Sequence, residues 1–421
     1  MLKYPILLLI AGLLLTGCQD NITSLGAQYF SDTIANKTSI RNDPGFIQFA
    51  DTTRPFVTAN GIDYALTDST TLMIIGKVSV NNENLESWGF LQFPPMTADT
   101  VDSIVAVRLI LKDQQFKYGD TTSSLSSMVN FQVYAVYNAV SDSTSSFPTL
   151  PSSAVLVGSI DSNFADTVDH ALPILLNQNQ NAVIPLLIES NNAFVIVPNN
   201  QNGTPMTNAR GFGTIHSYGD ANSVPQIEYF LKNGDSIFRT PTLDFHIVHD
   251  MSLPLSPKEF TLRGSAGNRE RITLNLTRPA DTAHLDALTT INNALLVLHL
   301  DPANSSHSNV SGDTIGPDIA ELGLVDSGGH YDGNGYLDPT DPTKTTYRFQ
   351  VRGILQNWLR NPSSNLGFEL RSGYSARAFS ANMPEVIGVE DNTLNRWTFF
   401  GPSCSDTTKR PYFILSYSKL K

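Results

Sequence analysis

The chain contains an internal repeat, in which three segments of the first half recur in the second half. The matching pairs are 217–230 with 403–416, 104–111 with 291–298, and 72–76 with 260–264. In the first pair, a serine is followed eight positions later by a proline and then by an apolar segment. Because the three pairs occur in the same order at nearly constant spacing, we expect two related domains, at 39–235 and 240–421.

Within each half, the apolar residues are spaced as in β-strands. Residues 105–111 form a short run of β-branched residues and leucines, and residues 128–136 alternate between apolar and polar. Alternation with a period of two is typical of a strand with one buried face. Residues 89–93 end at Pro94-Pro95, and proline cannot continue a hydrogen-bonded ladder. Many short strands with frequent turns predict an all-β fold of antiparallel sandwiches.

One segment departs from this pattern and predicts a short helix. Its apolar residues follow a helical period and the run ends at Asn361-Pro362. These residues are Val351, Ile354, Leu355, Trp358 and Leu359. A shorter counterpart in the first half contains Val183, Leu186 and Leu187, with Pro185 acceptable only in a first helical turn. We therefore expect one short helix in each domain.

The order of these segments carries a resemblance to a known family. A strand of the form Ile-x-x-Ala-x-Leu-x-Leu precedes the 351–359 helix, which is followed by Asn-x-Gly-Phe-x-Leu and a final strand led by proline. This order resembles the DNRLRE-type domain, although the hexapeptide that names the family is absent. The resemblance implies tandem jelly-roll-like β-sandwiches on a secreted or surface protein, and some members of the family are associated with polysaccharide binding.

The N-terminus has the features of an export signal. Lys3 precedes an apolar stretch, 4–15, which is too short to cross a bilayer core of about 30 Å. Leu15-Thr16-Gly17-Cys18 resembles a bacterial lipobox, and residues 18–32 are similar to the start of uncharacterised envelope lipoproteins. We expect a signal peptide at 1–17 and lipidation of Cys18. An ordinary secretory signal that ends near a cysteine is the alternative.

The lipobox and the composition together predict location and exclude some partners. A tether at 18–38 would hold the folded chain to the cell envelope, at the outer membrane or the cell surface.

The formal net charge of −12 becomes −13 once Lys3 is removed, so nucleic acid is an unsuitable partner. With Cys18 lipidated, Cys404 has no cysteine to pair with. The fold must therefore be stabilised by its apolar cores and not by disulfides.

One segment has the spacing of a calcium-binding loop. Its oxygen-bearing residues correspond to positions 3, 5, 7, 9 and 12 of an EF-hand loop, with Gly335 at the turn. They are Asp332, Asn334, Tyr336 (through its carbonyl), Asp338 and Asp341. His330 occupies the first position, where a carboxylate is usual, so a surface loop rich in turn-forming residues is the alternative interpretation.

The remaining candidate residues favour structural roles. His246 and His249 are three apart in a predicted strand and would therefore lie on opposite faces, which disfavours a shared metal. Trp88, Trp358 and Trp397 could stack on sugars, but we expect all three to be buried. No motif of a hydrolase or of a phosphate-binding loop is present.

These observations lead to a functional hypothesis with two alternatives. We expect a lipid-anchored, non-enzymatic binding or structural module, with polysaccharide or another envelope component, such as an envelope protein, as its partner. The first alternative is a polysaccharide-cleaving enzyme, which would need two carboxylates that converge in a cleft. The second is a purely structural component of envelope assembly.

Overall fold

The computed structural model describes residues 35–41, 47–53 and most of 72–419. Within the last range, the segments that are not described are 80–82, 98–99, 101–102, 120–127, 138–149, 164–170, 179–182, 184–186, 189–192, 200–205, 216–222, 251–257, 264–267, 275–284, 286, 307–315, 322–330, 366, 381–382 and 391–393. Strands make up most of the described residues, so the predicted all-β class is confirmed.

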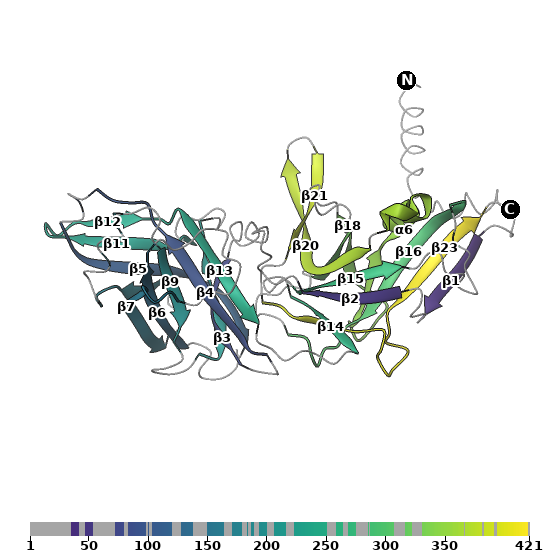
Figure 1. The fold of residues 1–421 in the computed structure, drawn as a ribbon, viewed down its shortest axis with the longest axis horizontal. Helices are drawn as coiled ribbons and strands as arrows, with labels where there is room; N and C mark the ends of the chain where they lie inside the picture. The colour runs from purple at the N-terminus through teal and green to yellow at the C-terminus, as the bar shows by residue number, and fades with distance from the viewer. Residues whose placement is uncertain are drawn as a thin grey trace, which may run out of the picture.

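The first half of the chain forms an eleven-stranded antiparallel sheet (Figure 1). Its strands are β3 (Leu72–Val78), β4 (Leu85–Gln92), β5 (Ile104–Gly119), β6 (Met128–Val136), β7 (Val155–Asn163), β8 (Ala171–Leu175), β9 (Ala193–Pro198), β10 (Asn208–Gly213), β11 (Gln226–Leu231), β12 (Ser236–Arg239) and β13 (Leu243–Asp250). The order is β12-β11-β5-β10-β3-β4-β9-β6-β7, with β8 paired to β5 and β13 paired to β4.

The second half forms a ten-stranded sheet that also includes the two N-terminal strands. Its strands are β1 (Ala35–Arg41), β2 (Ile47–Thr53), β15 (Asn268–Leu274), β16 (Thr289–His299), β17 (Gly316–Glu321), β18 (Tyr331–Leu337), β19 (Thr346–Gln350), β20 (Phe368–Ser380), β21 (Met383–Glu390) and β23 (Tyr412–Lys419). A separate two-stranded ladder joins β14 (Glu259–Leu262) to β22 (Trp397–Phe400).

Strand pairing in the two halves repeats with the spacing of the sequence repeat. Ile227 of β11 is opposite Leu109 of β5, and one repeat later Phe413 of β23 is opposite Leu296 of β16. The second set of equivalent pairs is Phe212 with Met73, and Phe399 with Phe260. Residues at equivalent positions of the repeat therefore face equivalent partners in the two halves, as expected for a duplicated sequence. The division into two domains stays a prediction.

The strand pairing crosses the boundaries expected from the sequence. β1 begins at Ala35, inside the segment expected to be a tether, and pairs with β23 at the C-terminus. β2 lies in the expected first domain but pairs with β15 of the second half. Backbone pairing between distant segments leaves no signal in local periodicity, so no sequence pattern indicated these positions for β1 and β2.

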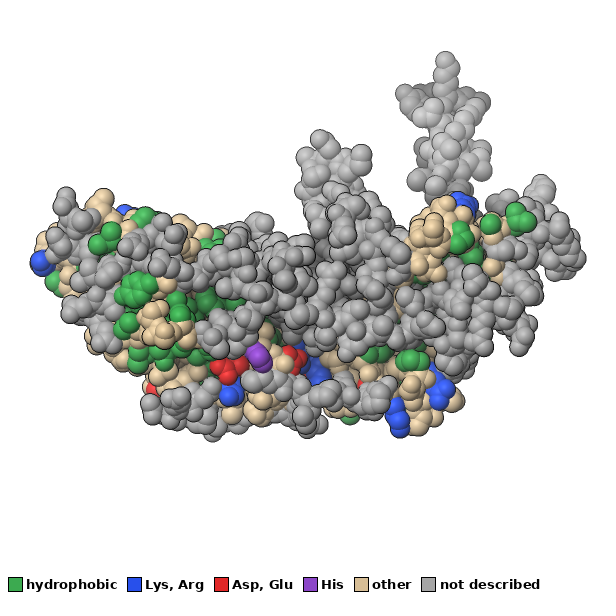
Figure 2. Space-filling view, in the orientation of Figure 1, with side chains coloured by type: hydrophobic (Ala, Val, Ile, Leu, Met, Phe, Trp, Pro, Cys, Tyr) green, Lys and Arg blue, Asp and Glu red, His purple; other side chains and the backbone are tan. Residues whose placement is uncertain are grey.

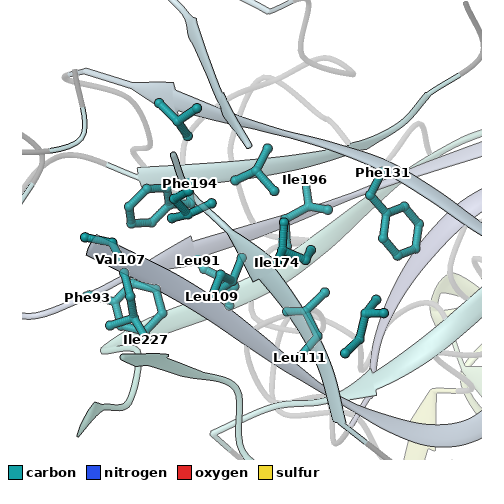
Figure 3. Close-up of a cluster of buried hydrophobic side chains, with 14 of the residues drawn as sticks. Leu91, Phe93, Val107, Leu109, Leu111, Phe131, Ile174, Phe194, Ile196 and Ile227 are labelled. Carbon is teal, nitrogen blue, oxygen red and sulfur yellow. The ribbon is translucent and has the colours of Figure 1, made fainter. Parts of the chain in front are cut away.

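Each large sheet buries its own apolar core. In the first half, the inward residues of β5 (Val107, Leu109 and Leu111) pack against residues from other strands, including Phe131, Phe194 and Ile227 (Figure 3). Burial of this many aliphatic and aromatic side chains is the dominant stabilising contribution, at about 25 cal/mol per Å² of apolar surface. The core of the second half is centred on β16, β23 and the helix.

The predicted helix is present as α6 (Arg352–Arg360). All five apolar residues predicted to form its inward face are buried, and Trp358 is fully buried. Pro362 opens a short 3-10 turn, η4 (Pro362–Ser364), directly after Asn361. The expected counterpart at 183–187 lies partly outside the described residues, although Val183 and Leu187 are buried in the first core. In the part of the chain that the structure describes, no helix is long and apolar enough to cross a membrane.

A buried cluster of charged side chains joins the two halves. Glu83, which precedes β4, accepts hydrogen bonds through Oε1 from Arg263 Nη2 at 3.0 Å and from Ser306 Oγ at 2.5 Å. Arg396 Nη1 lies 3.4 Å from the same oxygen, and Tyr118 Oη donates to Oε2 at 2.7 Å. Glu83 and Tyr118 belong to the first half, whereas the other three residues belong to the second half. The cluster therefore connects the two halves directly.

Arg263 is the most deeply buried charge of this junction cluster. Its Nη1 donates to the Leu394 carbonyl at 3.1 Å, and its Nε lies 3.5 Å from Asp250 Oδ2. Burial disfavours the charged guanidinium, but the attraction of Glu83 and Asp250 and the hydrogen bond to Glu83 outweigh it and raise the pKa of Arg263. Burial also raises the pKa of Tyr118 above its ordinary value. Arg263 is thus cationic and Tyr118 neutral at physiological pH.

Candidate functional site

The residues expected to bind calcium do not all lie in a loop. Tyr331–Leu337 is strand β18, in which Asn334 is opposite Asp318 and Tyr336 is opposite Arg348. The segment around Gly335 is therefore paired backbone, not the tight turn that the sequence suggested. Asp332 belongs to the same strand. The structure describes no side-chain positions for Asp332, Asn334 or Tyr336.

Asp338 and Asp341 follow β18 and stabilise two successive turns. Asp338 Oδ1 accepts from the backbone N and the Oγ1 of Thr340, at 2.9 and 2.7 Å, and Arg348 pairs with the other oxygen. Asp341 accepts in the same way from Thr343 and, through Oδ2, from the backbone N of Thr346 at 2.8 Å. These hydrogen bonds hold the pKa of both carboxyls below the ordinary value. The same Asp-x-Thr turn recurs at Asp406, and calcium binding at 332–341 stays a prediction.

The two histidines of β13 lie in different environments, in agreement with the strand prediction. His246 is buried, and His249 is partly exposed beside Glu86 of β4.

Figure 2 shows acidic, basic and histidine side chains gathered on the surface between the two halves. Within the described residues, no group of three or more His, Cys, Asp or Glu side chains could hold a metal ion. Cys18 lies outside the described residues, and Cys404 is buried with a free thiol.

All three tryptophans are buried, as the sequence suggested. Trp88 donates from Nε1 to Glu86 Oε1 at 2.8 Å, and Trp397 packs edge-on against Tyr347. Their faces are therefore not available to a ligand. Aromatic rings that could bind one are instead provided by phenylalanines.

Two phenylalanines lie on the outward face of β11 and β12. Phe238 is 49% exposed and is opposite Glu228, and Phe230 is partly exposed and is opposite Ser236. Their register makes the two phenylalanines diagonal neighbours on one face of an antiparallel pair, about 7–8 Å apart. Ile227 and Tyr229, which alternate with Glu228 and Phe230 along β11, are buried in the core. The alternation of the strand thus fixes both rings on the solvent side.

A charged pair continues this face onto β5. Arg108 is opposite Glu228, and its guanidinium both pairs with that carboxylate and lies 5.1 Å from the centre of the Phe230 ring. A guanidinium over an aromatic face is attracted by the quadrupole of the ring. Leu175 of β8, 44% exposed, is opposite Arg108 and completes the row. We call the surface formed by Phe238, Phe230, Arg108, Glu228 and Leu175 the outer face.

The outer face combines apolar rings with fixed hydrogen-bonding groups. The side chain of Glu228 is buried and holds Arg108 in place through their ion pair. The side chain of Arg108 remains 38% exposed. Exposed aromatic rings bind the C–H faces of sugars, and a few fixed polar groups orient a ligand. This surface was not predicted from the sequence. The signal was available in the alternation of 226–231, but Glu228 and its partner Arg108 lie far apart in the chain.

No protein-family model matches the chain, and a search of curated proteins finds no match.

Proposed function

We propose that this chain is a lipid-anchored protein of the cell envelope that acts as a non-enzymatic binding module for polysaccharide. Cys18 would carry the anchor, and the outer face would carry the ligand. Support for the anchor comes from the sequence, where a short apolar segment ends at Leu-Thr-Gly-Cys. Support for ligand binding comes from the outer face.

The observation that carries the proposal is the exposed Phe238 beside the fixed Arg108–Glu228 pair. Large apolar side chains on an edge strand expose surface to water at a cost, and such patches frequently mark interaction sites. The open sheet surface suits an extended chain of sugar rings. Two diagonal rings would contact successive parts of that chain.

Thermal melting of the chain from Cys18 onward, against a panel of polysaccharides, tests this proposal. A ligand that binds only the folded state must raise the melting temperature. We expect a rise with at least one glycan, and we expect Phe238→Ala to weaken binding about tenfold, because it removes one stacking ring. Leu288→Ala is the matched control, since Leu288 is exposed but lies in the second half.

Three outcomes would contradict the proposal. No shift with any glycan would favour a purely structural role. An equal loss of binding in Leu288→Ala would remove the outer face as the site. The appearance of shortened glycan products would convert the binding module into a polysaccharide-cleaving enzyme.

A further inference from the structure

A second polar surface lies along α6, at the end of the molecule away from the eleven-stranded sheet (Figure 1). An open groove of about 600 Å³ runs along this helix, where it lies against the start of β16. The lining residues are Thr290, Arg352, Gly353, Gln356, Asn357, Arg360 and Asn361. Two of them are cationic and none is acidic, although the chain as a whole carries a formal net charge of −12.

The groove is anchored to the sheet beneath it by hydrogen bonds. Gln356 accepts from the Ile291 backbone N at 2.7 Å and donates to the Thr289 carbonyl at 3.2 Å. Arg352 donates from Nε to the Ile291 carbonyl at 3.2 Å. Among the described residues, Arg360 makes no hydrogen bond or ion pair, and Arg352 uses only Nε. Both guanidiniums thus retain donors for an anion.

The groove lies close to the start of the folded chain. Ala35 of β1 is opposite Ser418 of β23, and Ser418 is opposite Thr290 of β16. Neighbouring strands are about 4.8 Å apart, so Ala35 is about 10 Å from Thr290 across the sheet. Only the short segment 19–34 separates Cys18 from Ala35 in the sequence. A lipid on Cys18 would therefore tether this end of the molecule to a membrane.

Resting on the proposed lipid anchor, we propose that the α6 groove binds anionic headgroups of the membrane that holds Cys18. A guanidinium matches the geometry of a phosphate and can bind it through two parallel hydrogen bonds. Attraction to an anionic surface decays within about 8–10 Å at physiological salt, so it acts on the end that the tether holds close. The rest of the protein, which carries a net negative charge, is repelled by the anionic membrane surface. The outer face then points away from the membrane.

Arginine-specific labelling of the tethered protein tests this proposal. The chain from Cys18 onward is coupled through the Cys18 thiol to a maleimide lipid in vesicles, since Cys404 is buried. Phenylglyoxal then labels exposed arginines, and mass spectrometry measures the rate at each one. One set of vesicles is neutral phosphatidylcholine, and the other is an equal mixture of phosphatidylcholine and anionic phosphatidylglycerol.

We expect Arg352 and Arg360 to react several-fold more slowly on the anionic vesicles. Arg239 of β12, which is exposed in the other sheet, is the internal control and should react equally on both. If Arg352 and Arg360, like Arg239, each react at the same rate on both kinds of vesicle, the proposal is overturned. Equal protection by inorganic phosphate on neutral vesicles would assign the groove to a free anion instead. The tether in this experiment is chemical, so its result does not depend on natural lipidation. Failure of the proposed lipid anchor would appear separately, as an unmodified Cys18 in protein purified from the envelope.

Discussion

At the residue scale, the structure places two kinds of buried polar group whose consequences differ. Glu83 is surrounded by donors, and its charge is offset by Arg263 and Arg396. His246 is also buried, but among the described residues neither of its ring nitrogens has a hydrogen-bond partner. Burial of a satisfied charge fixes a geometry, whereas burial of an unsatisfied imidazole makes stability depend on pH.

Glu83→Gln should destabilise the protein by about 3–5 kcal/mol, because it leaves two buried guanidiniums without their shared carboxylate. Chemical denaturation followed by tryptophan fluorescence measures this loss. Glu86→Gln is the matched control, since Glu86 pairs with Lys77 at 3.8 Å nearer the surface, where such a pair contributes less than about 1 kcal/mol. Equal effects of the two substitutions would contradict the role assigned to the junction.

Stability should fall as the pH is lowered from about 6.5 toward 4. Burial lowers the pKa of His246 to about 4, so the unfolded chain takes up this proton first and the folded state loses about 3 kcal/mol across that window. Above pH 6.5 the imidazole is neutral in both states and contributes no pH dependence. Denaturation curves measured from pH 4 to 8 test this, with His246→Leu expected to flatten the profile. A His249→Gln variant that flattened it equally would refute the assignment.

At the element scale, local pattern predicted more than pairing did. The helix at 352–360 could be predicted because its four apolar residues and the preceding Val351 share one face. Strands such as β5 and β6 could be predicted from their composition and alternation. The partner of each strand could not be predicted in this way, except where the repeat implied it. The outer face was missed for this reason, because it requires β12, β11, β5 and β8 to be neighbours.

The 338–346 segment shows the same limit for the candidate calcium site. The spacing of oxygen-bearing residues fits a calcium loop, and equally fits two Asp-x-Thr turns that follow a strand. The backbone departs from a calcium loop around Gly335, where strand β18 continues instead of turning. Calcium binding in this segment stays a prediction.

Asp341→Ala should lower the melting temperature by roughly 2–4 °C without added calcium, because it removes the acceptor for the Thr343 and Thr346 amides. Differential scanning fluorimetry with a calcium chelator and with calcium measures the effect. The Asp406→Ala variant serves as the control, because it removes one similar Asp-x-Thr turn that lies outside the candidate calcium segment. A wild-type melting temperature that rises with calcium, and no longer does so in Asp332→Ala, would instead support an ion at 332–341.

At the scale of the whole molecule, two large sheets are joined by a buried charged cluster, with the outer face and the α6 groove at different ends (Figure 1). In our proposal, the lipid and the groove hold one end at the membrane, and the outer face meets polysaccharide at the other. The repeat predicted two related domains, and that division stays a prediction. The return of β1 to pair with β23 could not be foreseen, yet it determines which half lies nearest the proposed anchor.

The most direct test of the proposed anchoring is the mass of the N-terminal peptide of the protein purified from the envelope fraction. We predict a peptide that begins at Cys18 and carries a diacylglyceryl group, with the protein lost from membranes in Cys18→Ser. A mature N-terminus elsewhere, or a Cys18 free of lipid in a protein recovered from the soluble fraction, would contradict the proposal.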